Sequence, residues 1–200
     1  MNRYLITGTT SGIGQAIRRH IEGDIFELNR TQADLNNPDE VMALDIPTVD
    51  YAILNAGHDT GGGVNFLEHN PRHMFDIINC NLTSNMLLAQ KILSKNKHAV
   101  IVLVTSTNLN KQYPNNLAYN LSKMGLKNLG DLIKVDIPYA QIKEARIGLT
   151  KTEFNNNRHK PGHKPINDLY AFEHLTVDAV AEKIIRLMFS DKDFEQINAK

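Results

Sequence analysis

Short apolar runs alternate along most of the chain with segments in which apolar residues recur every three or four positions. The runs at residues 4–6, 25–28, 49–54, 99–104 and 141–146 have the length of buried strands. The run at 99–104 is continuous rather than alternating, which is typical of a central parallel strand covered on both faces. The segments between the runs have helical spacing. This pattern predicts an α/β domain.

Two of the expected helices carry apolar stripes. Asn70 before Pro71 is typical of an N-cap and a first helical residue, and we expect the stripe that follows to be buried. A second stripe lies along residues 117–133 and leaves another face of that helix free for chemistry. We expect further helices to begin at Pro38 and after Thr176. The first stripe comprises Met74, Ile77, Ile78, Leu82, Met86, Ala89 and Leu93, and the second Leu117, Leu121, Met124, Leu129, Leu132 and Ile133.

Size and charge narrow the classes of protein. A chain of 200 residues suits a single domain over residues 1–200. Its 22 acidic and 22 basic residues cancel, so no overall field favours nucleic acid or an anionic membrane. The longest aliphatic run, 99–104, is far below the roughly 20 residues that cross a bilayer. We therefore expect a small-molecule partner, with no nucleic acid and no membrane.

Cysteine usage and the amino terminus bear on the compartment. Cys80 is the only cysteine and cannot form an internal disulfide. Residues 1–4 are not followed by the apolar region of a signal peptide. Both observations favour a cytoplasmic location.

A glycine-rich turn, residues 7–14, separates the first apolar run from a segment with helical spacing. Glycines permit a tight turn and a close approach of the backbone to a ligand, and the free amides at a helix start attract a diphosphate. A dinucleotide would fit there, although the spacing of Gly8, Gly12 and Gly14 differs from the GxGxxG fingerprint. A turn that binds nothing is the alternative.

Tyr119 and Lys123 form a candidate acid-base pair. Four residues apart on a helix, they lie on one face a turn apart. A free phenol titrates at about pH 10, so a neighbouring ammonium that stabilises the phenolate makes it a better proton shuttle. Ser106 follows the buried run at 99–104, and the three groups could converge. The alternatives are a solvated helix face and an ordinary turn serine.

Taken with the glycine turn, Ser106, Tyr119 and Lys123 closely resemble the pattern of the classical-type short-chain dehydrogenase/reductase (SDR) family, of which this would be a shortened member. The resemblance implies a single domain with a Rossmann-type doubly wound parallel sheet in three α/β/α layers. Asn81 matches the asparagine of the family's catalytic tetrad, although it could instead bond only to helix backbone. Residues 55–57 match the family's Asn-Ala-Gly stretch, whose asparagine braces the sheet.

Cofactor contacts follow from the same resemblance. Asp34 and Leu35 resemble the pair beside the adenine, and Gly148 belongs to a Pro-Gly loop in which Ile147 replaces the proline. Thr152 matches the threonine that holds the nicotinamide amide. The implied cofactor-binding residues are Gly8, Thr10, Ser11, Gly12, Ile13, Gly14, Arg30, Asp34, Leu35, Asn55, Ala56, Gly57, Tyr119, Lys123, Gly148 and Thr152.

The choice of dinucleotide depends on the end of the second strand. An arginine there accommodates the extra phosphate of NADP, whereas an acidic residue bonds the ribose hydroxyls of NAD. Arg30 therefore favours NADP(H), and Ser11 could add a hydrogen bond to the phosphate. Glu27 keeps NAD(H) open, and an ordinary surface arginine is the alternative.

The implied reaction is hydride transfer between the nicotinamide and a carbonyl or alcohol carbon, with Tyr119 as general acid or base. Ser106 would hydrogen-bond the substrate oxygen, and Lys123 would lower the tyrosine pKa and hold the nicotinamide ribose. Asn81 would support a water that relays protons. Because NADP is kept mostly reduced in cells, Arg30 favours carbonyl reduction.

Two departures from the family keep another class of function open. Only residues 31–33 separate Arg30 from Asp34, where the family places a helix and a strand, so we expect one edge of the sheet to be trimmed. Only residues 194–199 remain for the last strand, which could be vestigial. The trimmed sheet and the loop with Ile147 favour a non-catalytic dinucleotide-binding redox sensor or scaffold, whereas the retained tetrad favours an enzyme. The epimerases and dehydratases among the extended relatives need a longer carboxyl-terminal region.

The remaining expectations concern the substrate side and assembly. The basic loop 158–165 occupies the place of the family's substrate lid. A metal site at its two histidines is the unfavoured alternative, because no cysteine or acidic residue is adjacent, so we expect no metal. Asn108, Asn110 and Gln112 would form a polar wall, and residues 61–63 a flexible link. The helices with Asn81 and Tyr119 usually pack against their copies in the family, which implies a homodimer.

Overall fold

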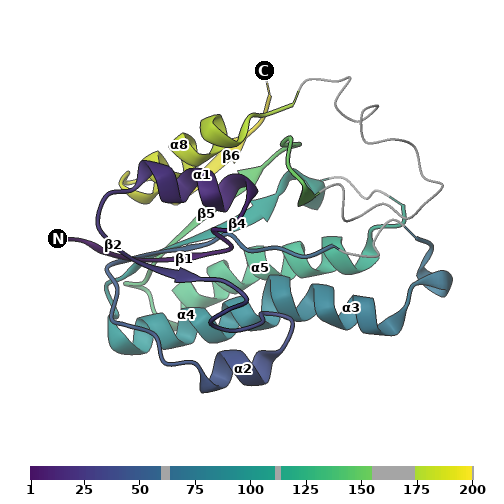
Figure 1. The fold of residues 1–200 in the computed structure, drawn as a ribbon, viewed down its shortest axis with the longest axis horizontal. Helices are drawn as coiled ribbons and strands as arrows, with labels where there is room; N and C mark the ends of the chain where they lie inside the picture. Colours follow the sequence, from purple (N-terminus) through teal and green to yellow (C-terminus); the bar gives the residue numbers. More distant parts are fainter. Residues whose placement is uncertain (60–63, 111–113, 155–173, 200) are drawn as a thin grey trace.

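Six parallel strands form one sheet in the computed structural model, which describes residues 1–59, 64–110, 114–154 and 174–199 (Figure 1). Neighbouring strands follow the order β2-β1-β3-β4-β5-β6. The order reverses between β1 and β3, which defines a doubly wound sheet. The strands are β1 (Arg3–Thr7), β2 (Asp24–Leu28), β3 (Tyr51–Leu54), β4 (Val100–Ser106), β5 (Gln141–Ile147) and β6 (Phe194–Ile197).

Helices cover both faces of the sheet and complete the predicted three-layer α/β/α fold (Figure 1). On one face lie α1 (Gly12–His20) and α8 (Val177–Met188). On the other lie α3 (Pro71–Ile78), α4 (Ser84–Lys95) and α5 (Leu117–Asp136), with α2 (Pro38–Ala43) beside α4. The 3₁₀ turns η1 (Phe66–Glu68) and η3 (Thr107–Asn110) lie in connecting segments.

Strand β4 shows why this sheet needs helices on both sides. All seven of its residues are buried. Ile101 and Leu103 belong to the apolar core under α4 and α5, whereas Val102 and Val104 belong to the core under α1 and α8. Because successive side chains of a strand point to opposite faces, a continuous apolar run fills two cores at once. The prediction of a doubly covered central strand is confirmed.

The trimmed edge of the sheet is confirmed. Residues 29–50 form α2 but no strand, so β2 is the outermost strand on that side. The short connection is instead tied to the long helix behind it, where Ser84 Oγ donates to Leu35 O at 2.7 Å and Asn79 Nδ2 donates to Asn36 O at 3.1 Å. At the opposite edge, the expected vestigial strand is present as β6, paired with residues 144–147 of β5.

The helix that begins at Pro71 is interrupted by a π-helical turn, η2 (Asn79–Thr83). Asn70 caps the helix start by accepting from Arg72 N at 2.9 Å, as the sequence predicts. The inclusion of Met86 in the buried stripe is wrong, because its side chain is 46% exposed. A π turn contains an extra residue, so the helix face beyond it is rotated relative to an uninterrupted α-helix.

Helix α5 turns its chemical face inward. Tyr119, Lys123 and Leu126 are buried, whereas Leu121 and Met124 of the apolar stripe are 55% and 47% exposed. The predicted separation of Tyr119 and Lys123 from the apolar stripe is confirmed, and most of the stripe faces outward. Its members Leu129 and Ile133 pack against the core instead. No helix within the described ranges is both long and apolar enough to cross a membrane. The predicted link 61–63, Gln112 and the basic loop 158–165 lie outside the described residues.

Candidate active site

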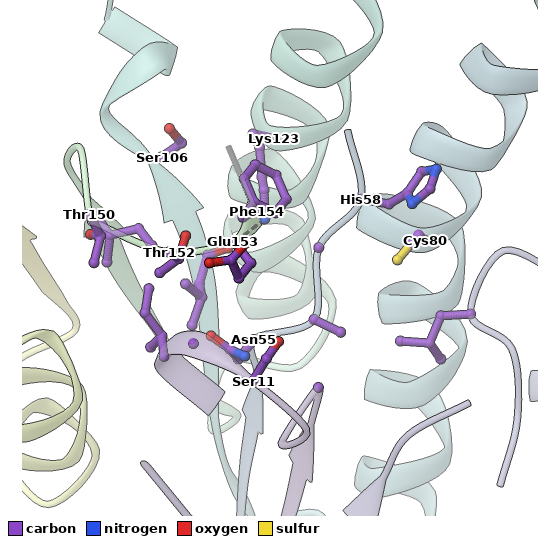
Figure 2. Close-up of a pocket in the computed structure, with 18 of the residues that line it drawn as sticks. Ser11, Asn55, His58, Cys80, Ser106, Lys123, Thr150, Thr152, Glu153 and Phe154 are labelled. Carbon is purple, nitrogen blue, oxygen red and sulfur yellow. Dashed lines mark hydrogen bonds between the residues drawn. The ribbon is translucent and has the colours of Figure 1, made fainter. Parts of the chain in front are cut away.

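A cleft of about 750 Å³ opens at the carboxyl ends of the strands, between β1 and β3, where the strand order reverses (Figure 2). Ligands of open α/β sheets bind at such a switch point. Of the predicted site residues, all but Gly14 and Asn81 line this cleft. These residues come from the segments that follow four of the strands, from the end of β4 and from helices α1 and α5. The two exceptions do not line the cleft.

The glycine turn forms one side of the cleft. Gly8 and Gly12 have φ angles of +72° and +55°, which favour glycine, and Ser11 makes no side-chain capping bond to α1. A Cβ at Gly14 would overlap the Gly8 carbonyl and come within 2.7 Å of Asn55 Nδ2. Gly14 therefore allows α1 to pack closely on the turn, and it makes no part of the cleft surface.

The Asn-Ala-Gly stretch is fixed to the end of β1 by one hydroxyl. Thr7 Oγ1 accepts from Asn55 N at 2.9 Å and from Ala56 N at 2.8 Å, and Asn55 Nδ2 donates to Thr7 O at 3.2 Å. These bonds place Ala56 against Gly8, where an added Cβ would lie 3.1 Å from Ala56 Cα. Asn55 thus lies where the predicted bracing of the sheet requires it.

Two charged side chains at the end of β2 lie in different environments. Glu27 accepts from Thr9 Oγ1 at 2.6 Å and from Arg18 Nε at 2.7 Å, and these bonds, the Thr9 bond first, lower the pKa of Glu27. Its carboxylate is thereby held toward α1 and does not line the cleft. Arg30 is exposed and lines the cleft, together with Asp34 and Leu35.

Ser106, Tyr119 and Lys123 face the same cleft (Figure 2 labels Ser106 and Lys123). Lys123 Nζ donates to Val104 O at 2.9 Å and lies 6.0 Å from the centroid of the Tyr119 ring. The Lys123 side chain is buried, and this burial lowers its pKa from 10.5 to about 8. Ser106 Oγ accepts from Asn108 N at 3.2 Å. A hydroxyl, a phenol and an ammonium therefore converge.

Asn81 joins the elements behind these groups. Its Oδ1 accepts from His58 N at 2.7 Å, and its Nδ2 donates to His58 O at 2.9 Å and to Ser122 Oγ at 3.0 Å. Ser122 Oγ in turn donates to Tyr119 O at 2.7 Å. Asn81 thus bonds loop backbone rather than the backbone of its own helix, which was the open alternative. It connects the segment after Gly57 with α5.

The loop after β5 closes the cleft opposite the glycine turn. Gly148 N donates to Ile197 O at 2.8 Å, which fixes the loop to β6. Thr152 Cγ2 lies 3.4 Å from the position of a Cβ on Gly12, so Thr152 packs across the cleft mouth onto the turn. Thr152 is therefore next to the start of α1.

Several cleft residues are absent from the sequence prediction. The Phe154 ring is tilted against Tyr119, with their centroids 5.9 Å apart. His58 and Cys80 also line this cleft (Figure 2). Burial lowers the pKa of His58 and raises that of the Cys80 thiol to about 12. Unlike the others, His58 is expected at the mouth of the cleft from the sequence, because it directly follows Gly57. Asn198 and Ala199 also line the cleft.

Comparison with known proteins agrees with this arrangement. A family model described as short chain dehydrogenase matches residues 21–162. The chain therefore belongs to the short-chain dehydrogenase family.

One curated relative is named "Granaticin polyketide synthase putative ketoacyl reductase 1", from Streptomyces violaceoruber. It is 26% identical over 73% of this chain, which spans 63% of the relative's length. Solved structures share the fold at lower identity. An alcohol dehydrogenase from Thermococcus sibiricus, complexed with 5-hydroxy-NADP, has a TM-score of 0.79 and 19% identity, with 100% of this chain and 97% of that chain covered. A serine dehydrogenase complexed with NADP+ has a TM-score of 0.82 and 17% identity, with 98% and 94% covered.

The buried Lys123 ammonium should give the cofactor-free protein a characteristic pH dependence. Below pH 8 Lys123 is protonated in both the native and the unfolded state, so it does not change the free energy of unfolding with pH. Between 8 and 10.5 the native state has lost it and the unfolded state retains it, so stability rises with pH. The difference between these pKa values corresponds to about 3 kcal/mol. Above pH 9 the Cys80 thiol, with its pKa raised from 9.0 to about 12, opposes this rise. Urea unfolding between pH 8 and 9 should therefore show the rise in the wild type and its loss in Lys123→Met.

Lys127→Met is the matched control, because Lys127 lies on the same helix with an exposed side chain. It should keep the wild-type rise. An unchanged rise in Lys123→Met would contradict the assigned burial effect.

Proposed function

We propose that this protein is an NADP(H)-dependent oxidoreductase that reduces a small carbonyl compound to an alcohol, or catalyses the reverse. The observation that carries the proposal is the convergence of Ser106, Tyr119 and Lys123 in one cleft with the glycine turn at the switch point of the sheet. Family membership supports an oxidoreductase, whereas the substrate and the role of Tyr119 are inferred from the residues.

The cleft fits a nicotinamide dinucleotide. The turn has no side chain at Gly8 and Gly12, so a diphosphate can approach the amides at the start of α1. Arg30, Asp34 and Leu35 would contact the adenosine end, and Thr152 and Tyr119 the nicotinamide end. The cofactor supplies or accepts the hydride.

The side chains of Ser106, Tyr119 and Lys123 would each have a different role in the proton transfer. Because Ser106 Oγ already accepts from Asn108 N, its own proton is directed to the substrate oxygen. Tyr119 gives that oxygen a proton as the hydride reaches the carbon. Of the three N–H groups of Lys123, one is held by Val104 O, which leaves two for the ribose and the phenol. Positioned donors of this kind stabilise developing charge.

Selectivity for NADP(H) rests on Arg30. Its cationic side chain lines the cleft beyond β2, where a 2′-phosphate would lie, whereas the carboxylate of Glu27 is occupied by Thr9 and Arg18. Similar proteins of known structure hold NADP+ or NADPH, including one from Sphingobium yanoikuyae with NADPH. Because cells keep NADP mostly reduced, we infer that carbonyl reduction is the physiological direction.

Titration with NADPH and NADH, followed by nicotinamide fluorescence, tests this assignment. We expect NADPH to bind at least about tenfold more tightly than NADH, and Arg30→Asp to abolish the difference, since each tenfold is about 1.4 kcal/mol. Arg186→Asp, an equal charge change on exposed α8, should leave the preference intact. If neither nucleotide binds, the glycine turn has another role and the enzyme proposal fails.

Tyr119→Phe tests the acid-base role. With NADPH and a panel of small aldehydes and ketones, kcat should fall by at least about a hundredfold, because general acid-base catalysis contributes this much or more. NADPH affinity should change little. Tyr139→Phe, at an exposed tyrosine, is the control and should retain activity. A wild-type protein that binds NADPH yet reduces none of the panel would favour the non-catalytic sensor.

We also propose that α4 and α5 carry a homodimer interface. Leu121 and Met124 on α5 and Met86 on α4 are large apolar side chains exposed on neighbouring helices. Sedimentation should give twice the 22.5 kDa of the chain. Leu121→Glu should yield monomers, since a charge would be buried without a partner. Met42→Glu, on exposed α2, should not. A monomeric wild type would contradict the interface.

A further inference from the structure

Asn85 is a fully buried polar residue that belongs neither to the cleft lining nor to the predicted site residues. Its relative exposure is 0%, and its side-chain Nδ2 donates to Cys80 O at 3.1 Å and to Asn81 O at 2.9 Å. It does not line the cleft. Both acceptors belong to the π-helical turn η2. The amide therefore uses both of its N–H groups on two successive carbonyls of that turn.

A π turn needs such support. Its hydrogen bonds span five residues instead of four, as in the bond from Ser84 N to Asn79 O. Such turns are rare and occur mostly as single insertions in α-helices, frequently at functional sites. A side chain that bonds the carbonyls of the turn stabilises it against conversion to regular α-helix. Asn85, one turn further along the helix, does this from inside the packed layer.

The conformation of this turn sets the direction of Asn81. Asn81 lies at the middle of η2, and its side chain reaches across to both backbone groups of His58. It also meets Ser122, which bonds the carbonyl of Tyr119. Regular α-helix at residues 79–83 would rotate Asn81 away from these partners. We propose that Asn85 is a positioning residue that holds the π turn and so aligns Asn81 with the catalytic helix.

The side-chain oxygen of Asn85 indicates that its two N–H groups, rather than the oxygen, are the reason for an asparagine here. Its Oδ1 is buried without a hydrogen-bond partner among the described residues. A buried unpaired acceptor costs free energy, which an apolar residue of similar size would avoid. The two donor bonds to the turn are therefore what an asparagine provides at this position. Asn85 does not line the cleft, and its side chain bonds two carbonyls of η2, so we expect its effect on the reaction to pass through this turn.

Substitutions of Asn85 can separate donor bonds from packing. Leu has the same branching and number of side-chain heavy atoms as Asn and has no donor. Ser is smaller, but its hydroxyl can bond the carbonyl four residues earlier, which is Asn81 O. If the donors matter, Asn85→Ser keeps more of the wild-type behaviour than Asn85→Leu. If Asn85 only fills space, the order is reversed.

Hydrogen exchange at the His58 amide measures the alignment directly, because this N–H donates to Asn81 Oδ1. We expect exchange to be about tenfold faster or more in Asn85→Leu, which is the factor that about 1.4 kcal/mol produces, and to approach the rate of Asn81→Ala. Asn85→Ser should fall between. Asn96→Leu is the matched control, because it removes an amide bond to Val49 O at the far end of α4, and it should leave His58 exchange unchanged.

The kinetic arm rests on the proposed reductase function, whereas the exchange arm does not. With an active substrate, Asn85→Leu should lower kcat about tenfold or more while the KM for NADPH stays within about twofold, and Asn85→Ser should restore part of the loss. Wild-type exchange at His58 in Asn85→Leu would overturn the inference whatever the activity. If the wild type bound no nucleotide and had no activity but the variants showed the expected exchange rates, the proposed reductase function would be refuted. The positioning role of Asn85 would then still hold.

Discussion

The close approach of β1 and β3 at their carboxyl ends is the constraint on which the cleft depends. The hydroxyl of Thr7 bonds the amides of Asn55 and Ala56 and so joins two strands whose connections leave in opposite directions. The missing side chain at Gly14 lets α1 begin directly on this junction. The nucleotide turn, the loop to His58 and the anchor of Asn81 all start from it. Helix α5 and the glycine turn keep a fixed relative position, because both are held to the junction of β1 and β3.

Local signals in the sequence were sufficient for most of the fold. The apolar run that ends at Val104 predicted a doubly covered strand, and Asn70 with Pro71 predicted a helix start, because each depends on neighbouring residues alone. The π turn was not predicted, since nothing in the spacing distinguishes it from regular helix. Met86 was wrongly included in the buried stripe. The pairing of β6 was also undecided, because it depends on a partner strand far away in the chain.

The sequence predicted the cleft residues that belong to the family pattern. It did not predict the contacts that depend only on tertiary packing. Ser106, Tyr119 and Lys123 line one cleft, and their catalytic roles stay a prediction. The pairing of Glu27 with Arg18 depends on how α1 packs beside β2, and Phe154 reaches Tyr119 only through the path of a loop. Neither can be read from spacing. Gly14 and Asn81 belong to the site as supports, a distinction that requires their contacts.

The long helix that includes η2 also holds the segment at the adenosine end. Ser84 and Asn79 bond the carbonyls of Leu35 and Asn36, within a few residues of Asn81. One helix thus holds both Asn81 and the segment of Leu35 and Asn36, so the helix itself fixes the distance between them. A shift of this helix along its axis would displace both together. In the trimmed sheet, the segment after β2 is therefore held by the same helix that carries Asn81, rather than by a strand and helix of its own.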